Sequence, residues 1–120
     1  MKQEDKELLM KDLCGRLPYG TTIVYCQNEI DWFEEEIGVG VISACINDEY
    51  VVKPYLFPMS SLNDKQLNEI RDYRNSIEGR LVGMQGRTIH LIDWLNEHHF
   101  DYRGLIEKGL AIDATNLNIY

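Results

Sequence analysis

The sequence of 120 residues lacks any long hydrophobic run. No apolar stretch approaches the roughly 20 residues that span a bilayer. No apolar stretch of signal-peptide length follows the charged first residues. These absences predict a soluble, cytoplasmic protein without a membrane-spanning segment. The length fits one domain of ordinary size, so we expect a single domain over residues 1–120.

Basic residues are few and scattered. Twelve lysines and arginines stand against 20 aspartates and glutamates, which gives a formal net charge of -8. Direct binding to a nucleic-acid backbone needs clustered basic side chains that replace counterions, so nucleic acid is disfavoured as a direct partner. Docking on anionic lipid is disfavoured for the same reason. An acidic surface favours solubility and can attract a basic protein partner.

Cysteine pairs with the spacing of metal-binding or redox motifs are also missing. Cys14, Cys26 and Cys45 lie 12 and 19 residues apart and are odd in number. This spacing does not match a CxxC pair. Each cysteine has apolar or β-type neighbours, so we expect reduced, buried thiols that pack as small hydrophobic side chains.

Motifs of known catalytic chemistry are absent from the sequence as well. The serines lack a GxSxG context. The pairs Gly38–Gly40 and Gly83–Gly86 lack the strand, turn and helix of a phosphate-binding loop. We therefore expect no catalytic residue and no cofactor.

What the sequence does contain is the patterning of an α+β domain. Apolar residues recur at helical spacing over residues 3–16, which predicts an N-terminal helix. β-Branched and aromatic residues fill 21–27, which predicts a strand. We expect a small, mostly antiparallel sheet over about residues 20–56, with C-terminal helices after it.

An apolar run at residues 37–46 is predicted to form one arm of a β-hairpin. Asn47 and Asp48 supply the turn, and residues 49–53 return. Two glycines inside the first arm suggest a bulge or bend, so a curled, SH3-like sheet is one form that the region can take.

Two neighbouring segments leave alternatives open. Residues 28–36 carry five acidic residues beside Trp32 and Phe33, which is compatible with an exposed edge strand or a loop. Residues 53–59 are apolar and contain two prolines. This second segment either crosses the core or forms an exposed apolar patch.

Three helices are expected after the sheet, at 61–78, 88–98 and 102–108. Their candidate N-terminal caps are Ser61, Thr88 and Asp101. The connector at 80–86 is apolar enough that we expect it to touch the core. The expected core residues are Leu9, Leu13, Leu17, Ile23, Tyr25, Val41, Ile46, Val52, Leu56, Leu67, Ile70, Ile77, Leu91, Leu95, Phe100, Leu105 and Ile106, with Leu81, Val82 and Met84 from the connector.

One group of residues has the spacing of a metal site. His90, Asp93 and Glu97 are three and seven residues apart and share one face of the third predicted helix. Histidine and carboxylates in this arrangement can bind a divalent metal ion. A solvated polar face accounts for the same pattern.

An aromatic and acidic surface is the main candidate for binding a partner. Aromatic side chains surrounded by carboxylates suit an interface with a basic protein. The candidate interaction residues are Trp32, Phe33, Glu34, Glu35, Glu36, Tyr55 and Phe57.

These observations favour a non-catalytic accessory or protein-interaction protein with an acidic surface. Its partner is expected to be a protein, and self-association stays open. One alternative is an acidic DNA mimic that inhibits a nucleic-acid-binding protein. Another is a small metal-dependent hydrolase that uses His90, Asp93 and Glu97.

Three segments carry a resemblance to a known group of proteins. They are residues 12–20 (DLCGRLPYG), residues 53–61 (KPYLFPMSS), and residues 93–96 (DWLN) with 99–111 (HFDYRGLIEKGLA). In these segments the chain resembles a family of short uncharacterised proteins from gut anaerobic bacteria, several of them encoded in phage-like or mobile regions. The resemblance implies an accessory or host-interaction role and assigns no activity, cofactor or catalytic residue.

Overall fold

The computed structural model describes residues 2–28 and 30–120. Short 3-10 turns at Leu17–Tyr19 and Met59–Ser61 join some of its longer elements. The helices are α1 (Gln3–Arg16), α2 (Val39–Ile46), α3 (Asp64–Asn75), α4 (Ile77–Leu81) and α5 (Gly83–Glu97). The strands are β1 (Thr22–Cys26), β2 (Phe33–Glu36), β3 (Val51–Pro58), β4 (Phe100–Asp101) and β5 (Ile112–Asp113).

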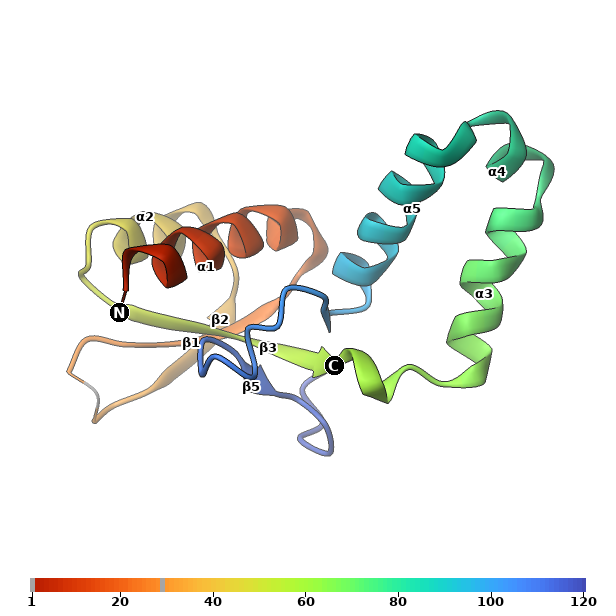
Figure 1. The fold of residues 1–120 in the computed structure, drawn as a ribbon. Coiled ribbons are helices and arrows are strands. Elements are labelled where there is room, and N and C mark those ends of the chain that lie inside the picture. Colours follow the sequence, from red (N-terminus) through yellow and green to blue (C-terminus); the bar gives the residue numbers. More distant parts are fainter. Residues whose placement is uncertain (1, 29) are drawn as a thin grey trace.

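The strands form one mixed sheet in the order β2-β1-β3-β4, and β5 also pairs with β3. Antiparallel pairing joins the three longer strands, and parallel pairing adds the two-residue strands β4 and β5. The α+β class is confirmed, because a helix precedes the sheet and further helices follow most of it (Figure 1).

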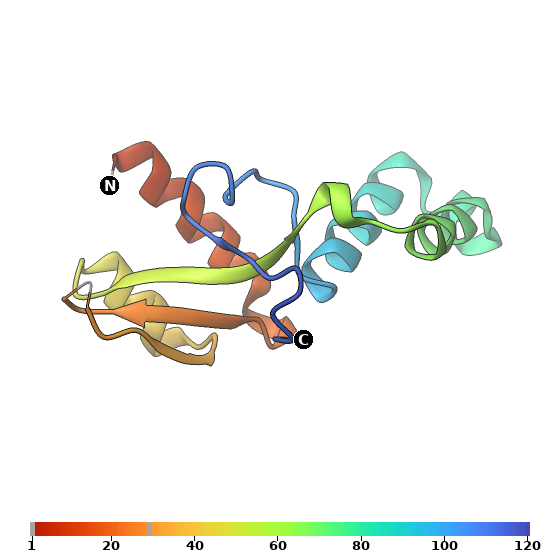
Figure 2. The ribbon, with the colours of Figure 1, turned by 90° about the horizontal axis from the view of Figure 1, so that it is seen from below.

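Helices α1 and α2 cover one face of the sheet (Figures 1 and 2). Leu9 and Leu13 of α1 are fully buried against Ile23, Val52 and Leu56 of the strands. These side chains form the main core, in which burial of a leucine or isoleucine contributes about 1.5–3 kcal/mol. On the opposite face, a smaller apolar cluster combines strand residues with residues of the C-terminal segment.

Residues 63–98, here called the arm, project from the rest of the chain, here called the body (Figures 1 and 2). The arm consists of α3, α4 and α5, and it meets the body where Trp94 and Leu95 pack against Phe100. The radius of gyration is 15.6 Å, whereas a compact chain of this length would have about 13–14 Å. Among the described residues, no helix is both long and apolar enough to cross a membrane.

The prediction of a β-hairpin at residues 37–46 was wrong, because this segment contains α2. Ile42 and Cys45 are three residues apart and pack on the main core from one side of that helix. Asn47 and Asp48 form the C-terminal cap of the helix and not the turn of a hairpin. The N–H of Asp48 donates to Cys45 and the N–H of Glu49 donates to Ala44, which is a Schellman motif with Asp48 at φ 57°. A short apolar run suits either element, so periodicity alone could not decide.

The predicted helix at 61–78 is divided into two shorter helices. α3 begins with a capping box in which Asn63, not Ser61, accepts from the N–H of Gln66 and the Gln66 side chain accepts in return. It ends at Asn75, and the Ser76 side chain caps α4.

The two later helix predictions also differ from the structure. α5 begins at Gly83, so Thr88 lies inside it and donates its hydroxyl hydrogen to the carbonyl of Met84. Residues 102–108 form turns rather than a helix. The Asp101 carboxylate does accept two N–H groups there, but Gly104 and Gly109 have φ values of 74° and 73°, which interrupt a helix.

Several expected core residues lie at the surface. Ile46 is exposed on α2, and the other misplaced side chains belong to the arm. Within residues 2–28 and 30–120, no second layer covers the outer part of the arm, so helical spacing there does not correspond to burial. The exposed arm residues are Leu67, Ile77, Leu81, Val82 and Met84. Cys14 is exposed as well, whereas Cys26 and Cys45 are buried free thiols.

Candidate functional site

Strand β2 lies at the edge of the sheet and exposes all of its residues. It pairs with β1 from Thr22↔Glu36 to Tyr25↔Phe33, and within the described residues its other side has no strand partner. Alternate N–H and C=O groups of such a strand point away from the sheet and can pair with another extended chain. Of the acidic segment 28–36, residues 28 and 30–32 are irregular, Phe33–Glu36 form the edge strand, and Glu29 lies outside the described residues.

The face of the sheet that lies opposite the helices carries an aromatic hollow beside β2. Its volume is about 270 Å³, and its lining includes Val24, Trp32, Lys53 and Tyr55. The Tyr55 hydroxyl donates to Glu34 Oε1 at 2.8 Å. Burial, with Glu34 as a further contribution, raises the pKa of Tyr55 to about 12. The Lys53 ammonium lies 5.8 Å from the centre of the Trp32 ring, within cation–π range.

The face of β2 on the helix side carries a second hollow, of about 220 Å³, lined by residues that include Tyr25, Glu35, Val41 and Tyr50. The ring of Phe33 lies 5.7 Å from Tyr25, and Tyr25 meets Tyr50 edge-on at 5.3 Å. Both faces of the edge strand therefore offer aromatic surface next to a glutamate.

Trp32, Phe33 and the three glutamates are consecutive in the sequence and lie at this edge. Trp32 is 42% exposed and Phe33 is 56% exposed. Tyr55 and Phe57 belong to β3 instead. Tyr55 is buried, and Phe57 is half-buried, so residues 53–59 belong mainly to the core rather than to an exposed patch.

The residues of the possible metal site do not converge. The His90 ring stacks on Tyr73 of α3 with 3.4 Å between the ring centres. Asp93 lies instead beside Tyr19, where burial first and then Asp93 raise the tyrosine pKa. Within residues 2–28 and 30–120, no group of three or more histidine, cysteine, aspartate or glutamate side chains is placed to hold a metal ion.

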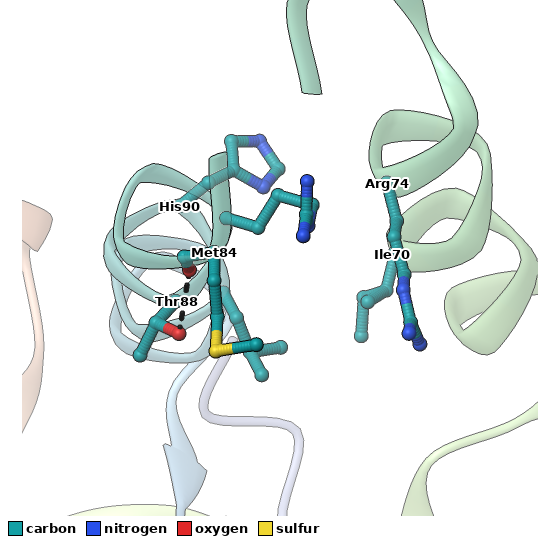
Figure 3. Close-up of a pocket in the computed structure, with 7 residues that line it drawn as sticks. Ile70, Arg74, Met84, Thr88 and His90 are labelled. Carbon is teal, nitrogen blue, oxygen red and sulfur yellow. Dashed lines mark hydrogen bonds between the residues drawn. The ribbon is translucent and has the colours of Figure 1, made fainter. Parts of the chain in front are cut away.

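The arm contains a surface that the sequence reasoning missed. A groove of about 250 Å³ runs between α3 and α5 (Figure 3). Ile70 and Arg74 form one wall, and Met84 and Thr88 form part of the other. The sequence did contain one indication of this surface. Most residues of α3 are charged or polar, so α3 offers little apolar surface against which α4 and α5 could pack.

A buried ion pair was also missed. The Arg16 guanidinium donates to Asp12 through two bonds of 2.7 and 3.0 Å and to the Phe100 carbonyl at 2.7 Å. Both side chains are fully buried. The pair fastens the segment after the arm to α1, and its i,i+4 spacing was visible in the sequence.

The chain matches no protein-family model, no curated protein and no solved structure. Its functional interpretation therefore depends on the geometry of the β2 edge and of the arm.

Proposed function

We propose that this is a non-catalytic interaction protein whose β2 edge binds a basic, extended segment of a partner protein. The observation that carries the proposal is the position of three consecutive exposed glutamates, Glu34–Glu36, on an edge strand. An extended partner segment would add a strand to the sheet, with backbone hydrogen bonds for affinity and alternate side chains for specificity.

Charge determines which kind of segment would bind. Outside the arm, fourteen acidic residues stand against seven basic ones, and the β2 region holds the densest acidic cluster. An acidic segment would be repelled there, because like charges across an interface cost free energy. Lysine or arginine side chains would meet Glu34 and Glu36 on one face of the edge and Glu35 on the other.

The aromatic side chains favour the same partner. Trp32 and Phe33 expose ring surface that can cover the aliphatic part of a lysine or arginine side chain. A cytoplasmic location and an accessory role in a phage-like or mobile element are part of this proposal. They are supported by the composition and by the resemblance described above.

The test is a binding titration with a fluorescent peptide of about eight alternating lysines and valines, a typical strand length or slightly more. The protein should bind it with an affinity that falls as salt is added. Glu35→Lys with Glu36→Lys should weaken binding at least about tenfold. Amide exchange at β2 should slow when the peptide is bound, because outward N–H groups gain acceptors.

The matched control is Glu4→Lys with Glu7→Lys, which changes the net charge equally on the exposed side of α1. This variant should bind the peptide within about twofold of the unmodified protein. A glutamate–valine peptide should not bind. Equal binding by both double variants, or unchanged exchange at β2, would refute the proposed edge.

A further inference from the structure

Several large apolar side chains in the outer half of the arm are exposed to solvent. Leu81 is 81% exposed, Ile77 is 78% exposed and Met84 is 77% exposed. α3 has no buried residue along its length. Large apolar side chains exposed this close together in the chain indicate a candidate binding surface.

Met84 also lines the groove between α3 and α5, next to the exposed Leu81 and Ile77 in the sequence. Figure 3 shows Ile70 and Arg74 on α3 across from Met84 and His90 on α5. The inner end is closed where Ile70 and Leu91 join the cluster around Trp94. Towards the tip, the Arg87 guanidinium connects α5 to α4 by donating to the Gly79 carbonyl at 3.0 Å. Between these two ends the groove is partly open to solvent, so side chains of another helix can enter it.

Charge along the arm changes sign from its base to its tip. Residues 70–90, the tip, contain four of the six arginines in the chain, Arg71, Arg74, Arg80 and Arg87, against two acidic residues. The base, residues 63–69 and 91–98, contains four acidic residues and one lysine. The base residues concerned are Asp64, Glu69, Asp93 and Glu97, with Lys65.

We propose that the occupant of the arm surface is the arm of a second copy of this chain, packed antiparallel about a two-fold axis. In this arrangement the basic tip of each arm lies beside the acidic base of the other. A parallel arrangement would place the arginine-rich tips together and would be repelled. The same patch serves both copies, as a two-fold interface requires.

The paired arms form a four-helix assembly. α3 and α5 have 12 and 15 residues, so they are about 18 and 22 Å long at 1.5 Å per residue. The exposed apolar side chains of each tip would pack against the base of the other arm, where Leu67 is exposed, and the arginines would lie at the rim of the contact. This dimer does not involve β2, so it stands independently of the proposed peptide-binding edge.

The test measures the molecular mass by sedimentation equilibrium across the micromolar range. The unmodified protein should change from monomer to dimer as its concentration rises. Arg74→Glu with Arg80→Glu reverses the tip, and Glu69→Lys with Glu97→Lys reverses the base. Each reversal should weaken self-association at least about tenfold, and all four together should restore it.

Charge-matched controls separate the arm from net charge. Lys11→Glu with Lys108→Glu, both exposed on the body, changes the net charge as the tip reversal does and should leave the association unchanged. Met84→Asp should abolish the dimer and leave the far-ultraviolet circular dichroism unchanged, because Met84 is exposed in the monomer. A monomer at every concentration, or failure of the combined reversal to restore the dimer, would overturn the proposal.

Discussion

His99 shows how strongly this structure constrains a single residue. Its backbone has a φ of 64°, its Nδ1 lies 3.2 Å from the Thr21 hydroxyl oxygen, and its ring stacks on Tyr120 at 3.6 Å. Burial, followed by Arg16 and His98, lowers the pKa of His99 from 6.5 to about 4. The neutral imidazole is therefore the form that the folded chain accepts.

This shift predicts that acid destabilises the protein. Between pH 6.5 and 4 the unfolded chain binds a proton at His99 and the folded chain does not, so the free energy of unfolding falls as the pH is lowered. The full loss is about 3 kcal/mol, reached near the folded pKa. Urea unfolding at a series of pH values between neutral and 4 measures it.

His99→Asn is the informative variant, because asparagine tolerates a positive φ and does not titrate in this range. It should lower stability at neutral pH and flatten the dependence between pH 6.5 and 4. His90→Gln removes a histidine from the arm and should keep the slope. An unchanged slope in His99→Asn would assign the acid sensitivity to other groups.

At the scale of elements, the glycines of α2 and α4 differ in the space around them. A Cβ placed on Gly40 meets no atom within 4 Å, whereas one placed on Gly79 meets the Tyr73 carbonyl too closely. Gly40→Ala should therefore raise the free energy of unfolding by about 0.5–1 kcal/mol through helix propensity. Gly79→Ala should instead disturb the turn between α3 and α4.

Thermal unfolding followed by circular dichroism measures the Gly40→Ala effect, and amide exchange at α4 measures the Gly79→Ala effect. Faster exchange confined to α3 and α4 is the expected result for the second variant. If Gly40→Ala lowered the melting temperature, residues 39–46 would not be helical in solution.

Sequence patterning was sufficient to predict an element when one of its faces packs on the core and the other is exposed to solvent. The predicted helix at 3–16 coincides with α1, since Leu9 and Leu13 recur at helical spacing between charged residues. It was insufficient for α2, whose residues are nearly all apolar. It also failed for Ile77, because helical spacing predicts a face but not whether another layer covers that face.

The candidate site was predictable to a similar extent. Clustered glutamates beside Trp32 and Phe33 indicated an exposed surface, since buried carboxylates without partners are costly. Their position on an edge strand depends on pairing with β1, and no local sequence pattern predicts that pairing. The arm groove could not be predicted, because it depends on the turn between α3 and α4. The sequence interpretation expected one continuous helix there.

At the scale of the whole molecule, the arm and the body differ in how much apolar surface they bury. The body contains the main core between α1, α2 and the sheet, and α3 contains no buried residue. Local opening requires less free energy where fewer apolar contacts are lost. In dilute solution, amides of α3 and α4 should therefore exchange much faster than those of β1 and β3.

Raising the protein concentration should slow exchange in the arm and leave the body unchanged, because only the arm gains contacts in the proposed dimer. Mass spectrometry of peptides after deuterium labelling at two concentrations measures this difference. Slowing in β2 rather than in the arm would indicate association through the sheet edge.

The projection of the arm has a consequence for how the protein would engage a target. The arm projects away from the body and its β2 (Figures 1 and 2). A pair joined through the arms would therefore leave each body free at the periphery of the assembly. A target with two suitably spaced cationic stretches would then be held at both ends, and bivalence can strengthen such an attachment by about 10²–10⁴. The spacer between the two stretches, rather than the strength of either single contact, would select among targets.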